Sequence, residues 1–155
     1  ARLGTGTADS SVHLRGDGTW AAAGGGKLLQ IQYVNLTTEW TVSSTSEADL
    51  AGLTATITPA STSSKIICML TGGVANNNSG SYMTLKLRRG NTLIAHRVTE
   101  RNGPYDYQVA TLNYVDSPST TNATTYKIAA NRNASGSSYL GINATTTSLV
   151  LMEIE

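Results

Sequence analysis

The segment 100–107, ERNGPYDY, carries the densest group of side chains in this sequence that could bind a ligand. A tyrosine offers a flat ring and a hydroxyl to a sugar, and Asn, Asp and Arg offer planar hydrogen-bonding groups. The Gly103-Pro104 pair favours a turn that presents these groups rigidly on a loop. The alternative is that the tyrosines only pack on the rim of a sheet. The predicted ligand-binding residues are Arg101, Asn102, Tyr105, Asp106 and Tyr107.

Catalytic and metal-binding patterns are weak by comparison. Glu100, Asp106 and Asp116 could supply a carboxylate pair for glycoside cleavage. Three acids among ten are no enrichment, so we interpret them as structural or solvated. The two histidines, His13 and His96, lie far apart in the sequence and have no second donor nearby, which argues against a metal site. No strained G-x-S-x-G turn is present. The sequence therefore predicts a binding protein without cofactor or metal, and not an enzyme.

Three other polar segments are typical of turns. The loops 76–81 and 131–138 are rich in Asn, Ser and Gly, and could be either weaker binding sites or solvated turns. The triplet Arg15-Gly16-Asp17 is followed by Gly18, which favours a tight turn. The same triplet is read by some cell-surface receptors, but we interpret it here as structural.

Short amphipathic runs predict about ten β-strands, separated by turn signals at the spacing of a sandwich. In Leu28–Val34 the apolar and glutamine side chains alternate, and Lys65–Thr71 is apolar on both faces, as expected of a central strand. Gly90-Asn91 predicts a hairpin between Tyr82–Arg89 and Thr92–Val98. We interpret Ser46–Leu53 as a turn or one helical turn. The other expected strands are Glu39–Ser44, Leu53–Thr58, Tyr107–Val115, Thr125–Ala130, Tyr139–Asn143 and Ser148–Ile154.

The last strand bears on the assembly. Leu149, Leu151 and Glu153 lie on one face, and Val150, Met152 and Ile154 lie on the other. A strand that is mostly apolar on both faces needs cover on both. A central place in a sheet would provide it, and so would a neighbouring subunit packed on the outer face, which we favour because symmetric homo-oligomers commonly hide such surfaces.

Composition narrows the classes of function. The 155 residues form one domain with a short tail, the net charge is +1, and charged residues make up 14%. This charge is too low for nucleic-acid binding driven by phosphate contacts. No run approaches the ~20 apolar residues of a membrane span, and no signal peptide is visible. The single cysteine, Cys68, sits in an apolar run and is expected to be buried.

The string LGTGTADSSVHLRGDGTW, from Leu3 to Trp20, resembles the segment that leads into the C-terminal domain of many bacteriophage tail-fibre and other virion fibre proteins. The strings ITPASTSSKIICML (57–70) and LKLRRGNTLIAH (85–96) also look like the β-rich tip domain that follows it. The resemblance implies an extended fibre segment over residues 1–26 and a tip domain over 27–155. It also implies an extracellular virion component, assembled as a homotrimer, in which the first segment continues into the rest of the fibre.

These observations together predict an all-β, jelly-roll-like antiparallel sandwich that binds a host-cell surface glycan or protein, without catalysis or membrane insertion. A structural head-fibre or tail-decoration trimer is the main alternative. A small glycan-cleaving tip is a third possibility. A fourth is an animal C1q- or TNF-like trimeric ligand, in which N-x-S/T sequons would carry glycans. These sequons lie at Asn35, Asn77, Asn122, Asn133 and Asn143.

Overall fold

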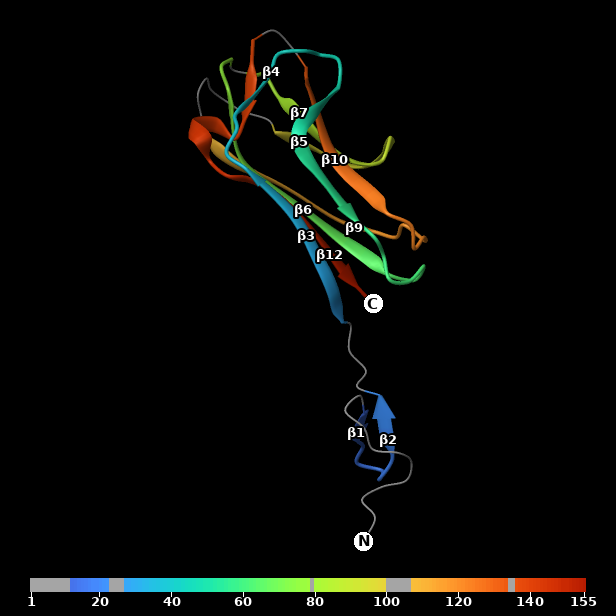
Figure 1. The fold of residues 1–155 in the computed structure, drawn as a ribbon. Coiled ribbons are helices and arrows are strands. Elements are labelled where there is room, and N and C mark those ends of the chain that lie inside the picture. Colours follow the sequence, from blue (N-terminus) through green and yellow to red (C-terminus); the bar gives the residue numbers. More distant parts are fainter. Residues whose placement is uncertain (1–11, 23–26, 79, 100–106, 134–135) are drawn as a thin grey trace.

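A computed structural model describes residues 12–22, 27–78, 80–99, 107–133 and 136–155. Two antiparallel β-sheets pack face to face, and a small separate hairpin precedes them in the chain (Figure 1). The prediction of an all-β sandwich is therefore confirmed. The described residues contain no helix long and apolar enough to cross a membrane.

Each sheet is built from strands that are distant in the sequence. The first sheet contains β3 (Leu28–Leu36), β4 (Trp40–Val42), β6 (Lys65–Asn76), β9 (Gln108–Asp116), β11 (Ser138–Leu140) and β12 (Thr147–Ile154). The second sheet has the order β5 (Ala48–Ile57), β10 (Thr124–Arg132), β7 (Met83–Arg89) and β8 (Thr92–Thr99). In the first sheet β3 and β4 follow each other along one edge and form one strand with a single interruption. β11 and β12 form a second interrupted strand beside it, with β11 paired to β4 and β12 paired to β3.

The strand pairing identifies the topology. β3 pairs with β12, β5 with β10, β6 with β9 and β7 with β8, all antiparallel. Each pair is nested inside the previous one along the chain, and successive pairs alternate between the two sheets. This nested arrangement is the jelly roll, a double-sheet fold made of two Greek keys. The pairing of β7 with β8 also confirms the hairpin predicted at Gly90-Asn91.

The core lies between the sheets and follows the predicted alternation. Met83, Leu85 and Leu87 of β7 point inward and are buried, whereas the residues between them lie on the outer face. Cys68 is fully buried in β6, as expected of a small apolar side chain. Burial, with a contribution from the charge of Asp116, raises the pKa of the Cys68 thiol to about 12, so this thiol stays protonated and unreactive.

The first sheet turns an apolar face to solvent. In β3 the glutamine side of the strand faces the interior, and Ile31 and Tyr33 point outward with 48% and 66% of their surface exposed. The reason is the fully buried Glu153, which accepts hydrogen bonds from Gln30 Nε2 and the backbone N–H of Ala60, both at 2.6 Å. Burial alone would raise the pKa of Glu153, but its hydrogen bonds outweigh this effect and lower it.

The helical turn considered for Ser46–Leu53 is wrong. These residues instead belong largely to β5, which begins at Ala48. Asp49 and Thr54 of β5 both pair with β10, and four residues, 50–53, separate them. Their partners on β10 are separated by only one residue, so β5 forms a bulge. This bulge turns both Leu50 and Leu53 inward, which explains their helix-like spacing of three residues. Gly52 has a φ of +85°, and a Cβ there would lie 2.9 Å from Leu36 Cδ1, so the bulge closes tightly against β3.

The N-terminal segment contains a short hairpin of β1 (Val12–Leu14) and β2 (Trp20–Ala22). Its turn holds the Arg15-Gly16-Asp17 triplet. The N–H of Gly18 donates to the carbonyl of Arg15 at 2.9 Å, and the Asp17 carboxylate accepts bonds from Thr19 N–H and Oγ1 at 3.0 and 2.7 Å. The Asp17 side chain is thus used within the turn, in agreement with the structural interpretation.

An ion-pair cluster lies on the outer face of the second sheet. Glu47 accepts hydrogen bonds from Arg88 Nε and, at 2.7 Å, from Lys86 Nζ. These bonds, first that from Arg88 and then that from Lys86, lower the pKa of Glu47 from its ordinary 4.5 to about 2. The folded state therefore favours the ionised carboxylate.

Glu47→Gln should cost stability in a pH-dependent way. Because the folded pKa is lowered, the carboxylate contributes fully above pH 4.5, and its contribution disappears as the pH falls toward 2. After allowance for solvent screening, we expect a loss of about 1–2 kcal/mol at pH 7 and almost none near pH 2. Urea unfolding of both proteins at pH 7, 4 and 2.5 measures this difference. A difference that stays constant with pH would contradict the assignment.

Candidate functional site

A depression of about 280 Å³ opens on the outer face of the first sheet, at the end where β9 begins. We call it the Tyr107 site. It lies at the opposite end of the sheet from the start of β3 and the end of β12. Ile154 of β12 pairs with Leu28 of β3 and with Lys65, the first residue of β6, whereas Gly73, near the other end of β6, pairs with Val109 of β9. Its described lining residues are Gly73, Tyr107, Gln108, Val109, Ile142, Asn143 and Thr145.

The floor of the Tyr107 site depends on the absence of a side chain at Gly73. Gly73 of β6 is paired with Val109 of β9, so both residues face the same outer side. A Cβ at position 73 would lie 2.6 Å from Thr145 Oγ1 and 3.5 Å from Ile142 Cγ2. The glycine therefore leaves room for the Ile142–Thr145 segment to lie close against the sheet.

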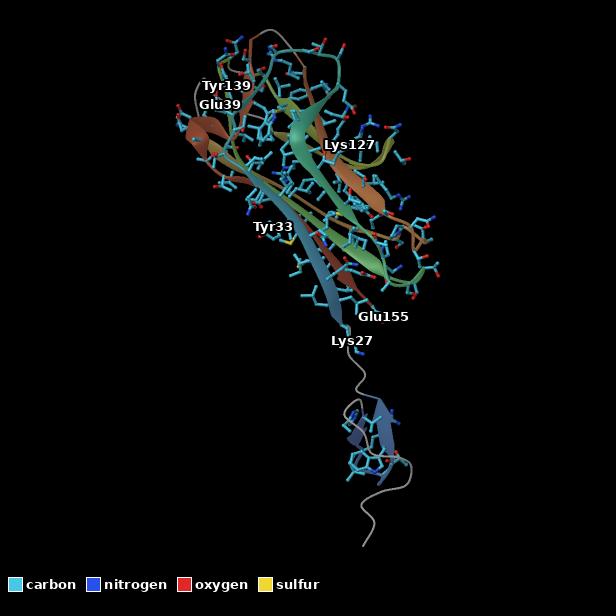
Figure 2. The ribbon with its side chains drawn as sticks, in the orientation of Figure 1. Lys27, Tyr33, Glu39, Lys127, Tyr139 and Glu155 are labelled. Carbon is cyan, nitrogen blue, oxygen red and sulfur yellow. The ribbon has the colours of Figure 1, made fainter. Side chains whose placement is uncertain are left out.

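The opposite wall is a short 3₁₀ turn, η1 (Ile142–Ala144), which separates β11 from β12. Gly141 enters it with a φ of 72°, and its N–H donates to Gly73 O at 2.8 Å. Asn143 and Ala144 also have positive φ, at 55° and 57°, a region that costs energy for residues with a side chain. The Asn143 N–H donates to Glu39 Oε2 at 3.3 Å. Figure 2 shows Glu39 and Tyr139 at this same end of the sandwich.

The described lining of the Tyr107 site consists of apolar and neutral polar residues. Its described lining has no carboxylate, histidine, cysteine or basic side chain. Tyr107 is 56% exposed and Val109 is 69% exposed, which gives an apolar platform at the protein surface. Asn143 and Thr145 add an amide and a hydroxyl beside it. A flat apolar surface with neutral hydrogen-bonding groups at its rim suits a sugar ring or a short peptide segment.

The structure describes only part of the predicted ligand-binding loop. Tyr107 lines the depression, and its role in ligand binding stays a prediction. The other predicted residues, Arg101, Asn102, Tyr105 and Asp106, lie outside the described residues, so their role stays a prediction.

Sequence reasoning missed the wall formed by Ile142, Asn143 and Thr145. The segment Tyr139–Asn143 was expected to be one strand, but β11 ends at Leu140. The Gly-Ile-Asn triplet at 141–143 was the available signal, because Gly and Asn are the residues that most readily adopt positive φ.

The two weaker candidate loops are joined to each other. The Asn77 N–H donates a hydrogen bond to the carbonyl of Ser137 at 3.0 Å, and the Ser137 N–H donates one to Asn77 Oδ1 at 2.7 Å. Tyr82 and Asn133 make a second link, with Tyr82 N–H donating to Asn133 Oδ1 at 2.8 Å. In the part of these loops that the structure describes, they form a linked pair of turns. Their role as weaker binding sites stays a prediction.

The acids and histidines weighed for catalysis or metal binding have other surroundings. Asp116 is buried, accepts a bond of 2.6 Å from Tyr126 Oη and pairs with Arg89 Nη1 at 2.9 Å, which is a structural role. Glu100 and Asp106 lie outside the described residues. His96 lies on β8 in an exposed position, as expected of a sheet-face residue. Among the described residues no group of three His, Cys, Asp or Glu could hold a metal ion.

Gly73→Ala is expected to weaken ligand binding at the Tyr107 site while the fold is kept. The new methyl group would displace Thr145, an exposed side chain that can rotate away, and would fill part of the depression. In a competition assay for a ligand of this site, we expect the variant to compete about three- to tenfold less well than the unchanged chain. Thr111→Ala, an exposed change on β9 outside the lining, is the matched control. Equal competition by both variants would exclude this site.

No family model and no curated protein sequence matches the chain. Among solved structures it is similar to dimeric latent PorU from Porphyromonas gingivalis, with a TM-score of 0.41 and 12% identity over 87% of this chain and 14% of that one. It is also similar to a protein of the T13 IBDV viral particle, with a TM-score of 0.47 and 9% identity over 94% and 42% of the two chains. Infectious bursal disease virus VP2 gives a TM-score of 0.43 and 11% identity over 88% and 41%. The chain spans less than half of each of these proteins, and similarity at this level assigns neither family nor function.

Proposed function

We propose that this chain is the C-terminal receptor-binding tip of a phage tail fibre. It acts as a homotrimer and attaches the virion to a glycan or protein on the bacterial surface. The observation that carries the proposal is an uncovered apolar surface on the first sheet, which we call the basal face. It is formed by the outward side chains of Ile31, Tyr33, Ile67, Met69, Val115, Val150, Met152 and Ile154.

The basal face is continuous because its residues are in register across the sheet. Tyr33, Val150 and Met69 form one row across β3, β12 and β6. Ile31, Met152, Ile67 and Val115 form the next row, toward the start of β3. Exposed apolar areas of this kind on soluble proteins usually mark interaction surfaces. The last strand is central in the sheet, but among the described residues no further element packs over its half-buried outer side chains.

The proposal assigns the two ends of the first sheet to different tasks. The basal face lies next to the start of β3, toward the fibre-like segment, and copies of the chain would bury it against one another (Figure 1). A row of Asn35, Ser148, Thr71 and Thr111 separates it from the Tyr107 site, which stays accessible at the far end. Three weak sites on one tip, repeated over several fibres, gain affinity through effective concentration.

Two measurements test the proposal. The mass of the chain in solution should be about three times 16.2 kDa, and a stable monomer would reject the assembly. The added protein should also block attachment of the phage to susceptible cells, and Tyr107→Ala should weaken that block. A trimer that binds no susceptible strain would instead indicate a structural fibre or decoration protein. Release of reducing ends from host polysaccharide would indicate an enzyme.

A further inference from the structure

A second groove crosses the outside of the sandwich, away from the basal face and the Tyr107 site. One part, of about 260 Å³, lies at the edge between β4 and β5 and is lined by Trp40, Ser44 and Leu50 among others. The other part, of about 430 Å³, lies on the outer face of the second sheet and is lined by Glu47, Arg88, Asn91 and Lys127 among others. Both parts are also lined by Ala48 and Asp49, so they adjoin along the start of β5.

The two parts differ in chemistry. The edge part has the half-buried Trp40, small apolar side chains and several serine and threonine hydroxyls. The face part has two carboxylates, Glu47 and Asp49, opposite two cations, Arg88 and Lys127. Figure 2 shows Lys127 on the side of the sandwich opposite Tyr33, so this groove would stay open when the basal face is covered.

The charged lining is fixed before any ligand arrives. Lys127 Nζ donates to Asp49 Oδ2 at 2.7 Å and to Asn91 Oδ1 at 3.4 Å. Arg88 donates through Nε to Glu47 and through Nη1 to Asn91 O at 2.5 Å. A guanidinium has five N–H donors and each carboxylate has about four acceptor positions, so these groups retain capacity for a ligand.

The balance of charge selects the class of ligand. An anionic ligand would face Glu47 and Asp49, and a cationic ligand would face Arg88 and Lys127. A neutral sugar avoids both conflicts, because its vicinal hydroxyls donate to carboxylates and accept from guanidinium and ammonium groups. Its apolar C–H face can pack on an indole ring. We propose that this groove binds a neutral oligosaccharide, with one sugar on Trp40 and the next units between Asp49 and Arg88.

The test is a printed array of neutral di- to hexasaccharides made of glucose, galactose, mannose, rhamnose and N-acetylhexosamines, with uronate and glucosamine oligomers as charged members. The proposal expects binding to at least one neutral member, reduced at least tenfold by Trp40→Leu and by Asp49→Asn. Asn91→Ala, at an exposed position, should reduce it about threefold. Thr111→Ala, an exposed change on β9 outside the lining of this groove, is the control and should not change it. Thermal unfolding of each variant verifies that it folds.

Other outcomes overturn the proposal. The protein could bind no neutral oligosaccharide on the array, or it could prefer the charged oligomers. Binding could also survive Trp40→Leu and Asp49→Asn but be lost in Tyr107→Ala. This inference rests on the proposed adhesion function, because a host surface would supply the sugar. The array and the attachment assay test the two proposals independently. A chain that binds the array through Trp40 and blocks no phage attachment would keep this inference and reject the tail-fibre function.

Discussion

Met69→Lys is expected to convert the proposed homotrimer into single chains of 16.2 kDa. Met69 lies near the centre of the basal face, between Val150 on β12 and Asn113 on β9, and 37% of its surface is exposed in the single chain. A lysine at this position can extend its ammonium into water when the chain is alone. Between packed copies the same charge would be buried without a partner, at a cost of several kcal/mol at each of its symmetric positions.

The mass of the variant in solution, from sedimentation or light scattering, measures this effect. Val98→Lys is the matched control, because Val98 is 42% exposed on the outer face of the second sheet, opposite the outward Thr84. It introduces the same charge and should leave the assembly intact. Val115→Lys, at another basal-face position with 56% exposure, should repeat the effect of Met69→Lys. If all three variants keep the mass of the unchanged protein, the basal face is not the contact between copies.

Local patterns were sufficient to predict much of the sandwich. In β7 every second residue is large and apolar and the residues between are polar, so strand, inward face and hairpin could all be read from neighbouring residues. In β3 the same alternation was visible, but it gave no information on which face is buried. That choice depends on Glu153, more than a hundred residues away, which draws Gln30 into the interior. An amphipathic pattern therefore predicts a strand more securely than it predicts the inward side.

The Tyr107 site and the groove beside Trp40 could also be predicted only in part from the sequence. Tyr107 could be proposed from the sequence alone, because it follows the Gly103-Pro104 pair, which favours a turn, and begins an expected strand. Its partners in the depression come from the interruption between β11 and β12, which forms because Gly141 and Asn143 adopt positive φ and Gly73 leaves space beneath them. The groove beside Trp40 depends on the bulge of β5, where the leucine spacing resembled a helix. Both cases require contacts between strands that are remote in sequence.

The linked turns at 76–82 and 131–138 depend on a buried arginine. Arg132, at the end of β10, has only 1% of its surface exposed. Its Nη2 donates to Ser81 Oγ at 2.8 Å, and its Nη1 donates to the carbonyl of Gly136. Asn76, also buried, donates through Nδ2 to the carbonyl of Ser81 at 2.9 Å. A single guanidinium thus bridges both turns, which its several donors in one plane make possible.

Arg132→Met is therefore expected to destabilise the fold by about 2–4 kcal/mol, because an apolar side chain of similar length leaves the buried Ser81 hydroxyl and the Gly136 carbonyl without their donor. Arg97→Met, at an exposed position on β8, is the control and should change stability by less than about 0.5 kcal/mol. Urea unfolding of the protein measures both, and hydrogen exchange of the Asn77 and Tyr82 amides should speed up in the first variant only. If Arg132→Met unfolds like its control, the two turns are held by their backbone and asparagine bonds, and the arginine is dispensable.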